Sequence, residues 1–109
     1  MATKANLYID QGATFSTTVT LTDSNGDPIN LTGYTGAAQM RKSYTSSTSY
    51  AFTVTLGGVY GTITLGLTAS ATANISGGRY LYDVELTDTS NIVSRVFEGI
   101  VTVNPNITR

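Results

Sequence analysis

The last third of the chain carries one long alternating pattern, and this pattern restricts the possible folds more than any other feature. Every second residue from Tyr80 to Leu86 is apolar, and a second run of β-forming residues extends over positions 93–103. A period of two is typical of a strand that buries one face. The polar residues 88–91 between the two runs are turn formers. The segment therefore predicts a β-hairpin and, with it, a mainly β fold.

Shorter alternating segments upstream predict the remaining strands. They cover residues 7–9, 15–21, 29–31, 34–44, 52–56 and 59–67. Glycine, asparagine and proline separate several of them, and Asn25-Gly26 favours a two-residue type I′ hairpin turn. Short strands with a turn signal about every 8–12 residues indicate an antiparallel β-sandwich, here of about seven to eight strands.

One segment has a helical composition instead. Thr68 is a favoured N-cap residue, and alanines follow it at positions 69, 71 and 73. Because alanine has the highest helix propensity, we expect one short helical turn near residues 69–75. Leu67 and Ile75, on either side of it, would close the end of the core.

The chain has few charges, and neither sign dominates. Charged residues make up 12%, and six Lys and Arg offset seven Asp and Glu for a formal net charge of −1. An average soluble domain has about 25% charged residues. Only Arg41 and Lys42 are adjacent basic residues, so no basic stripe of the kind that binds nucleic acid is present. Weak repulsion between copies favours assembly, and we expect contacts with other proteins and a homo-oligomer.

Cysteine and histidine are absent. Their absence excludes disulfides, thiolate nucleophiles, and histidine as a base or metal ligand, and no cofactor is expected. The first ten residues lack the apolar core of a signal peptide, and no apolar run reaches the roughly 18 residues of a membrane span. A length of 109 residues predicts one domain over residues 1–109, in which residues 1–12 form either an edge strand or a docking arm.

Asp23, Asn25 and Asp27 alternate in the manner of a calcium-binding loop. An EF-hand loop, however, requires glycine at its sixth position and a bidentate glutamate at its twelfth. Counting from Asp23, those positions hold Pro28 and Tyr34. The segment is therefore interpreted as a hairpin turn stabilised by Asx side chains, and no metal site is expected.

Carboxylates cluster in the terminal hairpin. Asp83, Glu85 and Asp88 lie within six residues of one another, and paired carboxylates can act as acid and base when they are buried together. Asp83 and Glu85 alternate with the apolar stripe, so they should face solvent. A three-residue loop would place Glu85 opposite Arg95, which would help fix the register. Glu98, before Gly99, interrupts an apolar run, and this step is either a β-bulge or an interface contact. No catalytic residue is predicted.

Seven tyrosines are present, and four of them, Tyr8, Tyr44, Tyr50 and Tyr60, are expected to be partly exposed. Exposed tyrosines gathered on one face could stack on sugars. Tyrosine is also enriched at protein interfaces, and we therefore expect these tyrosines to lie in the core or at protein interfaces.

Residues 76–84 resemble the start of strand F in immunoglobulin-like domains, where a Gly-x-Tyr-x-Cys-x-Val run carries the tyrosine corner. Tyr80 matches the corner tyrosine, and Tyr82 stands where those domains have cysteine. Since the chain has no cysteine and no tryptophan, this resemblance implies the sandwich architecture without the antibody signature.

Three segments, residues 29–41, 80–88 and 97–105, resemble small virion proteins of tailed bacteriophages. The resemblance extends over most of residues 15–109. It implies an immunoglobulin-like β-sandwich similar to the adaptor domains of phage baseplates and receptor-binding apparatus. It also implies a non-enzymatic structural or adaptor role in the tail, baseplate or neck of a virion, after synthesis in the host cytoplasm. The resemblance assigns no site residues.

Other functions remain open at this point. A carbohydrate-binding or host-adhesion module would present two or three exposed aromatic residues on one face. A glycosidase-like enzyme would need two carboxylates in a cleft. A capsid decoration protein would share the fold and differ only in its location on the particle.

Overall fold

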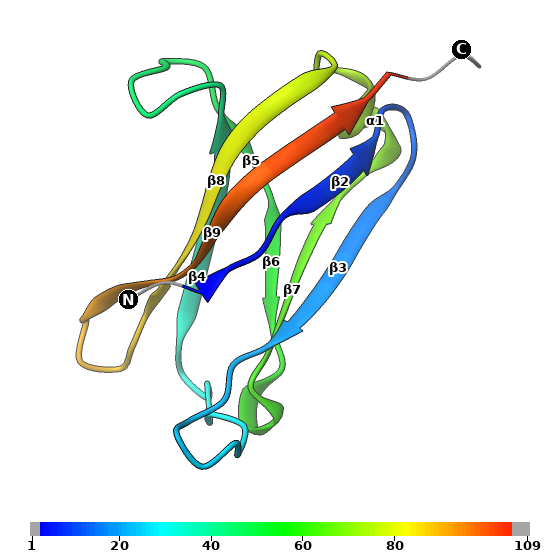
Figure 1. Cartoon of the computed structure of the whole chain (residues 1–109). Helices are drawn as coiled ribbons and strands as arrows, with labels where there is room; N and C mark the ends of the chain where they lie inside the picture. Colours follow the sequence, from blue (N-terminus) through cyan, green and yellow to red (C-terminus); the bar gives the residue numbers. More distant parts are fainter. Residues whose placement is uncertain (1–2, 106–109) are drawn as a thin grey trace.

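The computed structural model describes residues 3–105, which form two β-sheets packed face to face (Figure 1). The larger sheet contains β1 (Thr3–Lys4), β2 (Leu7–Asp10), β4 (Thr35–Arg41), β5 (Tyr50–Ala51), β8 (Gly78–Thr87) and β9 (Val93–Asn104). The smaller sheet contains β3 (Phe15–Thr20), β6 (Thr53–Leu56) and β7 (Thr62–Leu67). Two short helices, η1 (Gly58–Tyr60) and α1 (Ala69–Ala73), lie at opposite ends of the sandwich. The expected all-β class is confirmed.

The terminal hairpin forms as the alternating pattern predicts. β8 and β9 are antiparallel neighbours, and Glu85 lies opposite Arg95. Asp88 N–H donates to the carbonyl oxygen of Ile92 at 3.0 Å, which leaves three residues in the loop. Asn91 adopts a φ of 64° there, and asparagine tolerates this left-handed conformation better than most residues.

The sheets are not purely antiparallel, which corrects the prediction. β1 and β2 both pair parallel to β9, with Leu7 opposite Val101 and Ile9 opposite Val103. The N-terminal segment therefore lies along the last strand as an edge of the larger sheet. Parallel pairing of two segments so far apart in the sequence has no local signal, because only the path of the intervening chain brings them together.

The strands differ from the predicted segments at three places. The strand expected over residues 29–31 does not form, and that region has only an isolated bridge between Thr22 and Pro28. Residues 50–51, just before the predicted strand 52–56, form an additional strand: β5 pairs with β4 in the larger sheet, and β6 pairs with β7 in the smaller sheet. Phe52 lies at the crossing between them and is buried. Val59, expected to share a face with Ile63, instead lies in η1 and is 60% exposed. β1 is a second additional strand, so residues 3–105 contain nine strands.

The turn at Asn25-Gly26 differs from the predicted type I′ turn. Only Gly26 has a positive φ, 84°, whereas Asn25 does not. The Asp23 carboxylate accepts hydrogen bonds from the N–H groups of Asn25 and Asp27, at 2.9 and 3.1 Å. This is the Asx-stabilised turn that the sequence favours over a calcium loop, lengthened to three residues by the Asp23–Asp27 backbone bond of 2.9 Å.

The core lies between the two sheets. Its fully buried apolar members are Ile9, Leu31, Met40, Ile63, Leu65, Ile75, Val84, Val101 and Val103. The ring of Phe52 links the sheets, since it lies 6.0 Å from the ring of Phe15 and 6.2 Å from that of Tyr82. Aromatic pairs at such distances add to the stabilisation that burial provides.

The short helix closes one end of the core, as predicted. The Thr68 side chain caps it by accepting a hydrogen bond from Ala71 N–H at 3.2 Å. Thr72 is fully buried, donates to Ala13 O at 2.8 Å and accepts from Gly12 N–H at 3.0 Å. These bonds fix α1 to the turn between β2 and β3. Within residues 3–105, neither helix has the length and hydropathy required to cross a bilayer.

Candidate functional site

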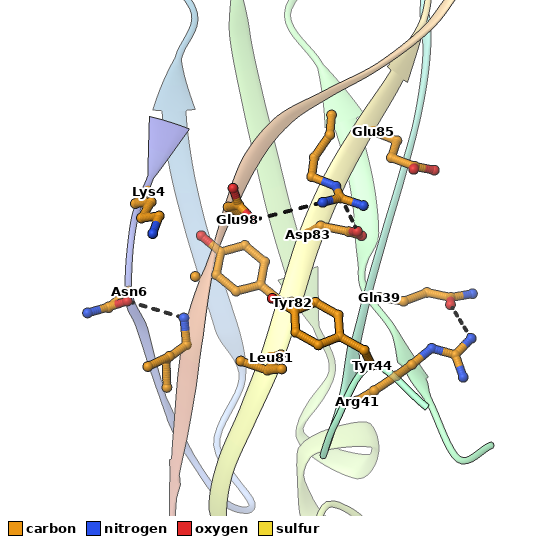
Figure 2. Close-up of a pocket in the computed structure, with 13 residues that line it drawn as sticks. Lys4, Asn6, Gln39, Arg41, Tyr44, Leu81, Tyr82, Asp83, Glu85 and Glu98 are labelled. Carbon is orange, nitrogen blue, oxygen red and sulfur yellow. Dashed lines mark hydrogen bonds and ion pairs between the residues drawn. The ribbon is translucent and has the colours of Figure 1, made fainter. Parts of the chain in front are cut away.

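The side of the larger sheet that faces away from the core carries a shallow depression of about 570 Å³ (Figure 2). We call this surface the outer face. The residues that line it are Lys4, Asn6, Gln39, Arg41, Tyr44, Leu81, Tyr82, Asp83, Glu85, Arg95, Glu98, Gly99 and Ile100. They come from four adjacent strands and their flanking segments, because residues of one parity along each strand point to the same side.

Strand register arranges these side chains in rows across the sheet. Arg41, Leu81 and Ile100 are consecutive cross-strand partners on β4, β8 and β9. Gln39, Asp83 and Glu98 form the next row. The outer face thus has two neighbouring apolar side chains, Leu81 and Ile100, beside a charged row.

Arg95 organises the charged row. Its Nε lies 3.3 Å from Asp83 Oδ2, and its Nη1 lies 3.9 Å from Glu98 Oε1. Asp83 and Glu98 are directly opposite each other, and two carboxylates in that arrangement repel. The guanidinium between them offsets this repulsion, so one cation holds two strands in register. Each pair is half-exposed and contributes only about 0–1 kcal/mol.

The partner of Arg95 differs from the prediction, although the register itself is correct. Glu85 lies opposite Arg95, yet the guanidinium contacts Asp83 and Glu98 instead. A β-bulge causes the difference: Val84 pairs with Phe97 and Glu85 with Arg95, so Val96 is an extra residue in β9. A bulge was one of two interpretations of the Glu98-Gly99 step; the register is regular there, and the bulge at Val96 instead changes the direction of the Arg95 side chain.

A second anchored cation borders the depression. Arg41 donates to Ser46 O at 2.7 Å and to Gln39 Oε1 at 3.1 Å, and Figure 2 shows the bond to Gln39. The contact with Ser46 ties β4 to the hydroxyl-rich loop that follows it. Tyr44, in the same loop, is 81% exposed beside the depression.

The predicted carboxylate cluster separates in the structure. Asp83, Glu85 and Glu98 lie together on the outer face, whereas Asp88 lies in the hairpin turn. The Asp88 carboxylate accepts hydrogen bonds from Ser90 N–H at 2.8 Å and Ile92 N–H at 2.9 Å. Asp88 is thus a turn-stabilising residue. The residues that the structure describes contain no group of three or more possible metal-binding side chains.

Two tyrosines of β8 anchor the terminal hairpin from inside. The Tyr80 hydroxyl donates to Ser76 O at 2.7 Å, and the Tyr82 hydroxyl donates to Ala5 O at 2.6 Å. Burial raises the pKa of both side chains above the ordinary value, and the nearby Tyr50 raises that of Tyr80 further. The Tyr82 hydroxyl thus joins β8 to the N-terminal segment.

The other tyrosines do not form one platform. Tyr8 lies on β2 and is 67% exposed, and Tyr60 lies in η1 and is 72% exposed. Tyr50 is partly exposed, as expected, and its ring packs edge-on against Tyr80 at 5.9 Å. Tyr44 is the only one of these four that lines the outer face.

The smaller sheet presents a contrasting surface. Its outward positions are Ser16, Thr18 and Thr20 on β3, Thr53 and Thr55 on β6, and Thr62, Thr64 and Gly66 on β7. None is charged, and Thr18 and Thr64 hydroxyls form a cross-strand hydrogen bond of 3.0 Å. The charges of the sandwich faces are therefore confined to the larger sheet.

Sequence reasoning missed the apolar centre of the outer face. Leu81 and Ile100 are apolar residues at positions whose parity is otherwise polar. These two breaks in the alternation could have predicted an apolar patch on the outer face. The contributions of Lys4 and Asn6 had no such signal, since they depend on the parallel pairing of the N-terminal segment with β9.

No protein family model matches the chain, and no curated protein matches it significantly. Among solved structures, the Listeria monocytogenes internalin-like protein lmo2027 is similar with a TM-score of 0.52 and 20% identity, over 94% of this chain and 28% of that protein. A family 123 glycoside hydrolase from Clostridium perfringens has a TM-score of 0.43 and 12% identity, over 97% of this chain and 24% of the enzyme. The chain thus spans about a quarter of the length of either protein. The first similarity shows a shared fold.

Proposed function

We propose that the chain is a non-enzymatic structural or adaptor protein of a tailed phage particle, in the tail, baseplate or neck, and that it acts by docking on other proteins through its outer face. The observation that carries the docking role is the cross-strand pair Leu81–Ile100, an apolar centre on the larger sheet bordered by the anchored charges of Arg41 and Arg95. The phage context rests on the resemblance of residues 29–41, 80–88 and 97–105 to small virion proteins.

We further infer that the sandwich is immunoglobulin-like. A three-stranded sheet, β3-β7-β6, packs on a sheet in which β8 lies between β9 and β4, as strand F lies between G and C in that fold. The Tyr80 bond to Ser76, four residues upstream, has the form of a tyrosine corner. Tyr82 fills the place of the inter-sheet cysteine with a buried ring against Phe52.

The geometry supports docking better than catalysis. Asp83 and Glu98 share one arginine and face an open depression. Two carboxyl groups act as acid and base only when different environments give them different pKa values. The exposed tyrosines, on three different elements, give no stacking platform for sugars.

Quantitative mass spectrometry of purified particles of the phage that encodes this chain tests the particle assignment. We expect a few to a few dozen copies per particle, scaled to the major capsid protein. A ratio near one would instead indicate capsid decoration, and absence of the chain from the particle would refute the structural role.

Incorporation of variants tests the docking surface. Ile100→Lys places a charge in the apolar centre, where the native side chain is 39% exposed, and should reduce incorporation about tenfold or more. The matched control, Thr55→Lys, places the same charge at an exposed position on the smaller sheet. Equal incorporation of both variants would exclude the outer face as the docking surface.

A further inference from the structure

η1 and the β8–β9 turn lie toward the same end of the sandwich (Figure 1), and this end has exposed apolar side chains. Four of the seven large apolar side chains that are exposed within residues 3–105 belong to this end. They are Val59 and Tyr60, 60% and 72% exposed, and Ile92 and Val93, 60% and 58% exposed. We call this surface the loop end.

Three loops form the loop end, and direct contacts join them. Leu31 N–H donates to Gly58 O at 2.9 Å, which connects the β3–β4 loop to η1. A Cβ atom placed on Gly33 would lie only 2.8 Å from Thr89 Cγ2, so the same loop also touches the β8–β9 turn. The loops that carry the apolar side chains are therefore in contact with one another.

The loop end is acidic. Its three loops, residues 21–34, 57–61 and 88–92, contain Asp23, Asp27 and Asp88 and no lysine or arginine. The Asp23 and Asp88 carboxylates hold the backbones of their turns, and Asp27 is exposed.

The opposite end of the sandwich is basic. Lys42 follows the last residue of β4, and Arg79 is the second residue of β8. The Lys42 ammonium lies 4.5 Å from the centroid of the Tyr80 ring, and Arg79 is exposed. Asp10, at the end of β2, is the only carboxylate of the flanking strand ends there, and it accepts from Asn104 Nδ2 at 3.4 Å. A β8 strand of ten residues separates the two ends by about 30 Å.

We propose that the loop end binds the basic end of a second copy of this chain, so that copies associate head to tail. Charge complementarity selects this arrangement, because a two-fold contact between loop ends would place carboxylates against carboxylates. A head-to-tail contact leaves one end of each copy free, and so continues into a row or closes into a ring. The contact goes beyond the docking role proposed above, because it uses a different surface.

The dimensions of the molecule limit the strength of this contact. Across its long axis the molecule measures 27 × 21 Å, so an end face can bury at most roughly 500 Å² per copy, against about 800 Å² per partner in a stable complex. Association of the isolated chain is therefore weak and is measured at protein concentrations up to about 1 mM. It is also salt-dependent, because exposed charges are screened beyond about 10 Å at 0.1 M salt.

Sedimentation equilibrium of the full chain tests the proposal. In about 20 mM salt the average mass of the wild-type chain should rise with protein concentration, and in about 500 mM salt it should return to that of the monomer. Asp27→Lys and Arg79→Glu should each weaken association about tenfold. Asp27 and Arg79 are both exposed, and neither residue lines the outer-face depression.

Matched controls place a charge of the same sign away from both ends and from the outer face. Thr18→Lys corresponds to Asp27→Lys, and Thr18→Glu corresponds to Arg79→Glu; Thr18 is exposed in the middle of β3 on the smaller sheet. Each control should associate as the wild-type chain does. An equimolar mixture of Asp27→Lys and Arg79→Glu should regain a dimer, because the intact loop end of one variant meets the intact basic end of the other.

Three outcomes would overturn the proposal. The first is a monomeric wild-type chain at 1 mM in low salt, and the second is equal weakening by end variants and controls. The third is association that persists in high salt, which would point to pairing of exposed strand edges instead. None of these three outcomes bears on the Ile100→Lys incorporation experiment. The head-to-tail contact and the docking role of the outer face can therefore be refuted independently.

Discussion

Gly99→Ala should detach the N-terminal segment from the larger sheet. A Cβ atom on Gly99 would overlap the carbonyl oxygen of Ala5 and lie 2.9 Å from its carbonyl carbon and 3.1 Å from Asn6 Oδ1. Two of these are backbone atoms, so the clash is relieved only if the segment before β2 moves away. The neighbouring strand, β9, is held by β8 and cannot yield as easily.

The magnitude follows from the hydrogen bonds that this movement breaks. They are Ala5 N–H to Glu98 O at 2.9 Å, the Tyr82 hydroxyl to Ala5 O at 2.6 Å, and Ile100 N–H to Asn6 Oδ1 at 3.2 Å. At about 0.5–1.5 kcal/mol each, their loss costs about 1.5–4.5 kcal/mol. Replacing glycine by alanine restricts the unfolded chain and returns about 0.4–1 kcal/mol. The expected net destabilisation is about 0.5–4 kcal/mol, against the roughly 5–15 kcal/mol of a typical domain.

Gly66→Ala is the matched control. Gly66 also lies inside a strand, and a Cβ there would meet only Phe15 O at 3.6 Å, an ordinary contact. This variant should be neutral or slightly stabilising. Urea unfolding followed by circular dichroism gives the free energies, and hydrogen exchange of residues 3–10 shows whether the segment detaches before the whole domain unfolds. Equal stability and equal exchange protection in the two variants would refute the reasoning.

Two further predictions concern the buried tyrosines and the helix cap. Burial raises the pKa of Tyr82, so above about pH 10 the folded state retains a proton that the unfolded state releases. Stability should therefore fall as pH rises through and beyond that value. Tyr82→Phe should flatten this loss in urea titrations between pH 8 and 11, and an unchanged slope would contradict the assignment. Thr68→Ala removes the acceptor for Ala71 N–H and should cost about 1 kcal/mol, measured by thermal unfolding; Ser70→Ala, on the exposed side of the same helix, is the control.

The elements that local patterns specify were predictable. The β8–β9 register, with Glu85 opposite Arg95, follows from alternation and from a loop of three residues. The N-cap at Thr68 depends only on the residues within one helical turn. In each case the interacting groups are close in sequence, so the chain itself limits the alternatives.

The outer face was predictable only in part. The sequence indicated that Asp83 and Glu85 point away from the core, and the structure places both on this face. It did not indicate that Arg95 would join Asp83 to Glu98, because the extra residue Val96 shifts the alternation of β9 and brings Arg95 to the same face as Glu98.

By itself, the sequence determined that this chain is all-β, where its longest hairpin turns, and which residues of that hairpin are buried. These properties depend on the period of apolar residues and on turn chemistry, both of which act over a few residues. Only the tertiary structure decided that the N-terminal segment runs parallel to β9, and that Phe52 marks the crossing from one sheet to the other. Those pairings join residues up to 94 positions apart, as in the bond between Ile100 and Asn6. They are selected by the packing of the whole core, for which no short stretch of sequence carries the information.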